Sequence, residues 1–214
     1  MASLDAKYDA ILAREQQFAL TVARKVVDKP ELSVWMFLIP IVFIYYIHRY
    51  QKFQAGVKLF SKEFVFTKKA ALDAAFQITR NGVSKDEALA TCCPDEEAGS
   101  AADEALATCC SDTALVKEIR RKQFKEVAFL VDHYVRLLTA DGDSYQSLVK
   151  KAYTRAGYRQ FLKQLQQVEK EVNQAAKHAF KETEGFLEFM SKMEVATELL
   201  RQEETKKLFN GSNL

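Results

Sequence analysis

Apolar residues recur every three or four positions along most of the chain, which is the spacing of an amphipathic α-helix. Residues 1–31 are predicted to form an N-terminal amphipathic helix. Its apolar pattern begins at Leu4, and Ser3 is its N-cap. A second continues through residues 51–82 and ends at Gly82, a residue typical of helix ends. The pattern predicts an all-α protein, and the scarcity of the turn residues Gly (7) and Pro (3) agrees with it.

The helical pattern is strongest in the C-terminal part, residues 113–214. A first helix is predicted over 113–142 and a last one from Phe186. Between them, apolar steps of three and four predict one long heptad-patterned helix over about 144–180, with a change of phase at Gly157. Three antiparallel helices with short connections make a helical bundle. The long helix would pack in its core or bind a partner helix as in a coiled coil.

One apolar segment, Leu32 to Tyr50, stands out from these amphipathic stretches. Within it, residues 34–47 are 14 consecutive residues without a charge, which span about 21 Å as a helix. The whole segment spans about 28 Å, close to the roughly 30 Å of a hydrocarbon core. Trp35 lies near one end and tyrosines near the other, as in the aromatic belts of membrane proteins. We therefore predict a membrane segment over residues 32–50, kinked at Pro40, which is spanning or re-entrant; a buried helix of a soluble core is the third alternative.

Charge alternates along the chain although the net charge is only +2. Residues 49–69 hold six basic side chains and one acid, so residues 51–82 are predicted to form a basic juxtamembrane helix facing anionic lipids, unless these charges are simply solvated. A second basic run, 117–125, contains Phe124 as its one aromatic residue, and we expect no nucleic-acid partner. The predicted partners are the lipid bilayer and a protein bound through the helices, or a second copy of the chain. The predicted location is a membrane, with the bundle in the cytoplasm.

The four cysteines lie in a duplicated motif within an acidic stretch, residues 83–112, that we predict to be a loop. The sequence DEALATCC occurs at 86–93 and again at 103–110, which indicates a tandem duplication. Four thiolates are a ligand set for zinc, Cu(I) or an iron–sulfur cluster, although the spacing matches no familiar metal motif. The candidate metal ligands are Cys92, Cys93, Cys109 and Cys110.

No arrangement of residues in the sequence indicates catalysis, and no cofactor is predicted. Glu126 and His133 are seven residues apart, and so are Glu171 and His178, but two helical turns separate such residues by about 10 Å, too far to bind one ion. We therefore predict a non-enzymatic, membrane-anchored helical scaffold or interaction protein. The alternative is a thiol- or metal-responsive membrane sensor that uses the duplicated cysteines.

Overall fold

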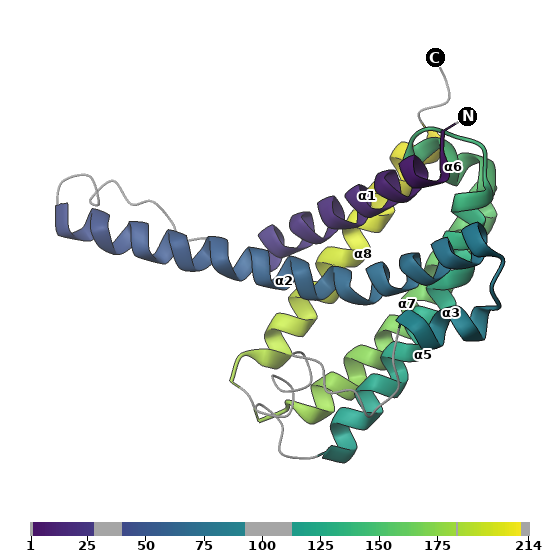
Figure 1. Ribbon diagram of the computed structural model, residues 1–214. Coiled ribbons are helices and arrows are strands. Elements are labelled where there is room, and N and C mark those ends of the chain that lie inside the picture. The colour runs from purple at the N-terminus through teal and green to yellow at the C-terminus, as the bar shows by residue number, and fades with distance from the viewer. Residues whose placement is uncertain (1, 28–39, 93–112, 183, 211–214) are drawn as a thin grey trace.

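The structure is a computed structural model that describes residues 2–27, 40–92, 113–182 and 184–210 (Figure 1). These ranges contain seven α-helices and no strand, which confirms the prediction of an all-α protein. The helices are α1 (Leu4–Val26), α2 (Pro40–Asn81), α3 (Lys85–Cys92), α5 (Thr113–Thr139), α6 (Tyr145–Ala152), α7 (Arg155–Ala179) and α8 (Phe186–Asn210).

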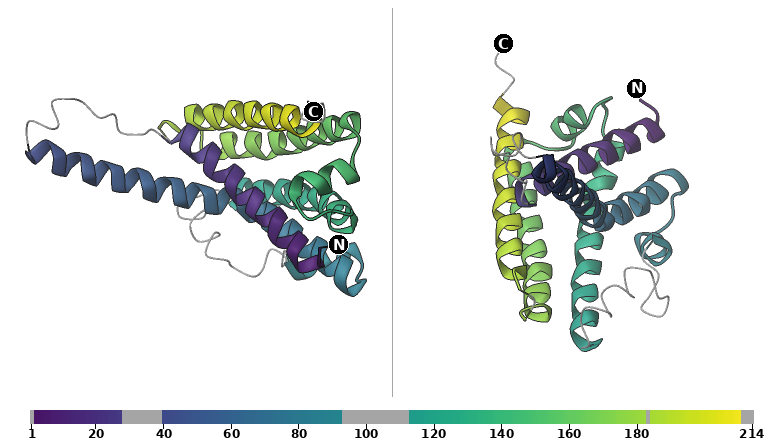
Figure 2. Two further views of the ribbon diagram at one scale, coloured as in Figure 1. Left: turned by 90° about the horizontal axis from the view of Figure 1, so that it is seen from above. Right: turned by 90° about the vertical axis from the view of Figure 1, so that its left-hand side faces the viewer.

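The ends of α1 and α2 follow the capping signals of the sequence. The Ser3 side chain accepts a hydrogen bond from the Ala6 amide at 3.1 Å, which satisfies one free N–H of the first turn of α1. Gly82 adopts a φ of 69° after the end of α2 and donates its N–H to the Ile78 carbonyl. The two helices pack on each other and cross, as Figure 2 shows.

Helices α5, α7 and α8 form the helical bundle that the sequence predicts, and they run antiparallel. Lys122 and Glu171 pair near one end of α5 and α7, whereas His133 stacks on Phe161 further along, so residue numbers run in opposite directions. Helices α7 and α8 pair in the same way, and α2 packs across α5 (Figure 1). We refer to α5 through α8 as the bundle.

The predicted long helix over 144–180 is instead two helices, α6 and α7. The backbone of Tyr153 is extended, and Thr154 starts a new helix by accepting a hydrogen bond from the Gly157 amide at 3.1 Å. This break explains the change of heptad phase in the sequence, because two helices that meet at an angle bury different stripes. The 25-residue α7 is shorter than α5, so it does not project from the bundle as a long helix would.

The predicted loop over 83–112 begins with a helix, α3, which covers most of the first DEALATCC copy. Ser84 accepts a hydrogen bond from the Glu87 amide, and Ala88 and Leu89 are buried against the core. Burying a leucine side chain contributes about 1.5–3 kcal/mol, which explains why an acidic segment folds here. Residues 93–112 lie outside the described part.

The main hydrophobic core lies where α2 crosses α5 and reaches α1, α3, α6, α7 and α8. Leu72 and Ala75 of α2 are fully buried there, together with Leu130 and Tyr134 of α5. A smaller cluster around Val22 joins α1 to α8. The C-terminal half of α2 is therefore part of the core, so this helix is fixed firmly to the bundle.

The other end of α2 extends away from the bundle, as Figures 1 and 2 both show. We refer to residues 40–52 as the α2 tip. The first described residue of α2 that is buried is Val57. Helices long and apolar enough to cross a bilayer do not occur in the described ranges. The predicted membrane segment falls partly on the α2 tip and partly on residues 32–39, which lie outside the described part, so this segment and its kink at Pro40 stay predictions.

Candidate functional site

Four charged side chains meet inside the protein where α2, α5, α7 and α8 come together. Lys68 of α2 lies 3.9 Å from the Glu126 carboxylate of α5 and 3.6 Å from the Glu169 carboxylate of α7. Arg201 of α8 donates two hydrogen bonds of 2.6 Å to Glu169. Lys68 and Glu126 are each only 5% exposed. We call these four residues the ion-pair cluster; it joins four helices through buried charges.

The two carboxylates of the ion-pair cluster respond differently to their surroundings. Burial raises the pKa of Glu126, and the opposing attraction of Lys68 does not cancel this effect. Burial acts on Glu169 in the same direction, but the Arg201 guanidinium and Lys68 outweigh it and hold its pKa below the usual range. Thr67 also donates a hydrogen bond to Glu126 at 3.3 Å. Glu126 is therefore the group in the cluster that takes up a proton most readily.

His133, which the sequence pairs with Glu126 by spacing, has a different environment. Its ring stacks on Phe161 of α7 with 4.0 Å between centroids, and its Nδ1 lies 2.9 Å from the Tyr153 hydroxyl. Burial lowers its pKa to about 3, helped by the positive charges of Arg14 and Arg136. The imidazole is therefore neutral at pH 7 and acts as a packing group between α5 and α7.

A second ion pair, partly buried, ties α1 to α8. The guanidinium of Arg14 binds both carboxylate oxygens of Glu204, and Nε lies 2.9 Å from Oε1. It also bonds Glu15 at 2.8 Å and lies over the rings of Phe18 and Tyr145. Bidentate pairs of this kind fix both distance and orientation, so α1 and α8 are held in register.

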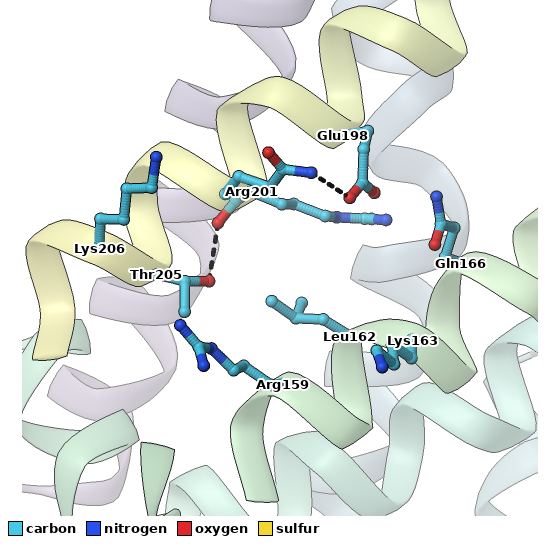
Figure 3. Close-up of a pocket in the computed structure, with 9 residues that line it drawn as sticks. Arg159, Leu162, Lys163, Gln166, Glu198, Arg201, Thr205 and Lys206 are labelled. Atoms are coloured by element: carbon cyan, nitrogen blue, oxygen red, sulfur yellow. Dashed lines mark hydrogen bonds between the residues drawn. The ribbon is translucent and has the colours of Figure 1, made fainter. Parts of the chain in front are cut away.

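A groove of about 330 Å³ opens between α7 and α8, close to the ion-pair cluster (Figure 3). Arg159 and Lys163 of α7 line one side, and Lys206 of α8 lines the other. Leu162 points into the groove, and the buried Arg201 belongs both to its wall and to the ion-pair cluster. The groove therefore combines basic side chains with an apolar surface, and it is the described cavity best suited to an anionic ligand.

Of the four predicted metal ligands, only Cys92 lies in the described part. It is the last residue of α3 and a free thiol, and the Gln77 amide lies 3.7 Å from its sulfur. Burial and the nearby Asp73 raise its pKa, which disfavours the thiolate that metal binding requires. The described residues contain no group of three or more metal-ligating side chains. Cys93, Cys109 and Cys110 lie outside the described part, so the four-cysteine site stays a prediction.

The ion-pair cluster was not predicted from the sequence, in which Lys68 and Lys69 belong to the basic run expected to face lipid. Lys68 instead binds Glu126 and Glu169, and Lys69 pairs with Asp73 on the surface. The spacing held a signal, because Lys68 falls on the same helical stripe as Phe64 and Ala71. A charge on an apolar stripe requires a buried partner.

No family model matches the chain, and neither a curated protein nor a solved structure matches it. Its function is therefore argued from its own residues. The charged side chains of the ion-pair cluster bind each other, whereas the α2 tip extends away from the bundle and the α7–α8 groove is open.

Proposed function

We propose that this chain is a non-enzymatic, membrane-anchored interaction protein in which α2 connects a lipid-binding segment to a helical bundle. One observation carries the proposal: the uncharged segment 34–47 continues into the end of α2 that extends away from the bundle (Figure 1). An apolar sequence that includes the end of such a helix would suit insertion into a bilayer. Residues 51–57, between the predicted membrane segment and the first buried residue of α2, rise only about 10 Å as a helix, so the bundle would lie close to the membrane surface.

The charges next to the segment support contact with anionic lipid. Lys58 and Lys62 of α2 are exposed and have no ion pair in the described part of the chain. Each basic residue near an anionic surface contributes about 1 kcal/mol of attraction. Lys68 and Lys69 are bound to carboxylates of the protein itself, so the lipid-facing part of the basic run ends before them.

The interior chemistry supports a structural role rather than a catalytic one. The ion-pair cluster joins α2 to three helices of the bundle. These contacts would hold the bundle in a fixed orientation relative to the helix that carries the proposed membrane segment. His133 is neutral at pH 7 and its ring stacks on that of Phe161. The exposed apolar side chains of α8, Leu187, Val195 and Leu199, offer contact surface to a protein partner.

Flotation with vesicles of phosphatidylcholine and phosphatidylserine tests the anchor. The full chain should float with the vesicles, and the double variant Val42→Glu/Ile44→Lys should float at least tenfold less. Each charged side chain at the centre of a bilayer costs about 2.5–3.5 kcal/mol. Two such side chains should therefore weaken membrane binding by more than tenfold.

The matched control is Val195→Glu/Leu199→Lys, which introduces the same charges at exposed apolar positions of α8 (60% and 49% exposed). This variant should float like the unmodified chain. Equal loss in both variants, with helical content unchanged, would show that the α2 tip has no special role. Absence of flotation for the unmodified chain would refute the anchor itself.

A further inference from the structure

The α7–α8 groove has an excess of positive charge. Farther along the same two helices, Lys177 binds both oxygens of Glu194 at 2.9 Å. In the groove, Arg159, Lys163 and Lys206 have no ion pair among the described residues. Lys177 and Arg201, which form ion pairs across the α7–α8 seam, are therefore neutralised, whereas the three basic side chains at the cavity are not.

The acidic side chain of the groove does not remove this excess. Glu198 is the one carboxylate among its lining residues, and it accepts a hydrogen bond of 2.8 Å from Gln202. Arg201 contributes no free charge, because both of its terminal nitrogens bind Glu169. Three cations therefore face one carboxylate, and an anion of charge −2 would balance the cavity.

We propose that the α7–α8 groove binds a small phosphate monoester with an apolar or aromatic body. A phosphate monoester carries close to two negative charges at pH 7 and offers three acceptor oxygens. Arg159 suits bidentate contact with it, and Lys163 and Lys206 act as point charges from opposite walls. Leu162 and the aliphatic stems of the basic side chains cover the apolar body (Figure 3). A volume of about 330 Å³ suits a compact ligand of this class.

A phosphate monoester can be free in solution or be the headgroup of a lipid such as phosphatidic acid. The groove lies toward the C-terminal end of α8, whereas the α2 tip extends from the opposite side of the molecule (Figure 1). With the tip toward the bilayer, the C-terminal end of α8 is the end farther from it (Figure 1). The free ester is therefore the source that the arrangement favours.

Calorimetric titration of the full chain with phenyl phosphate, at low ionic strength in a nonionic detergent, tests the site. We expect one saturable site, and the double variant Lys163→Gln/Lys206→Gln should bind at least tenfold more weakly. The control Lys150→Gln/Lys151→Gln removes the same charge from exposed positions of α6 and should bind like the unmodified chain. No saturable binding, or equal weakening in both double variants, would overturn the proposal.

A second arm identifies the source of the phosphate. Vesicles containing phosphatidic acid are added to the tip variant Val42→Glu/Ile44→Lys, in which insertion of the α2 tip is disrupted. Binding of phenyl phosphate without capture by these vesicles is the expected result. Capture that requires Lys163 and Lys206 would assign the same chemistry to a lipid headgroup.

Discussion

Replacing Lys68 by methionine should destabilise the folded chain by about 3–5 kcal/mol, whereas the same change at the neighbouring Lys69 should cost less than about 1 kcal/mol. Both lysines lie on α2 and both form ion pairs. They differ in burial, since the Lys68 side chain is 6% exposed and that of Lys69 is 52% exposed. The comparison therefore measures what burial adds to an ion pair in one helix.

The magnitude follows from the contacts of the ammonium group. At 3.6 and 3.9 Å, each carboxylate attracts Lys68 by about 4–5 kcal/mol when the effective dielectric constant is about 20. The cost of removing the ammonium from water offsets much of this attraction. Methionine keeps the aliphatic stem but leaves Glu126 buried without its cation, and it also loses the contact of Nζ with the Phe64 ring at 4.3 Å. The uncompensated charge of the buried Glu126 accounts for most of the predicted loss in the free energy of unfolding.

The loss should depend on pH, and Glu126 sets its direction. Its pKa is already raised by burial in the folded state, and removal of Lys68 raises it further. A carboxyl with a raised folded pKa contributes stability below its unfolded pKa, which is lost as the pH rises through the folded pKa. The deficit of the Lys68→Met variant should therefore be smaller at pH 5 than at pH 7. Adding Glu126→Gln should recover part of it at pH 7.

Urea unfolding followed by circular dichroism measures these differences at both pH values. The order of stability at pH 7 should be unmodified chain, Lys69→Met, the double variant Lys68→Met/Glu126→Gln, and then Lys68→Met. Equal losses at positions 68 and 69 would refute the reasoning, because they would mean that Lys68 is solvated in the folded protein. A deficit that grows toward pH 5 would contradict the assignment to Glu126.

Three further predictions concern other parts of the fold. His133 has a folded pKa of about 3, so its contribution to stability is complete above the usual histidine pKa of 6.5. This contribution falls by about 4–5 kcal/mol as the pH drops from 6.5 to 3. His133→Phe should make the urea midpoint depend less on pH over this range, and an unchanged dependence would contradict the prediction. Thr154→Ala removes the N-cap of α7 and should cost about 1 kcal/mol in the same unfolding assay, while no change would argue against the break before α7. Deleting residues 87–103 leaves one DEALATCC copy, in which Leu106 takes the place of Leu89 in the core. The melting temperature should change little. A loss of several kcal/mol in the free energy of unfolding would mean that residues beyond α3 are structural.

The helix ends were largely predictable because their signals are local. Ser3 caps α1, Gly82 follows α2, and α5 and α8 begin at or next to the residues that their patterns indicate. A cap is decided by hydrogen bonds within four residues, which a sequence shows directly. The break at Thr154 is also local, and the change of phase at Gly157 was its signal, although two patterns in succession look like one long helix.

The ion-pair cluster and the groove were not predicted because they depend on contacts distant in the sequence. Lys68 is more than fifty residues from Glu126, and Arg201 is more than thirty from Glu169. A lysine in a basic run looks solvated until the neighbouring helices are placed. Arg159 and Lys206 line one cavity only because α7 and α8 are antiparallel. The pairing of helices, which sequence pattern alone does not specify, creates both features.

Fluorescence of Trp35, the one tryptophan of the chain, tests membrane anchoring most directly, because it lies inside the apolar segment. Vesicles with bromine-labelled acyl chains quench a tryptophan only when the two are in contact. We predict that such vesicles quench the emission of the full chain and leave that of the variant Val42→Glu/Ile44→Lys unchanged. Emission that brominated vesicles do not quench, from a chain whose circular dichroism shows it to be folded, would contradict the account.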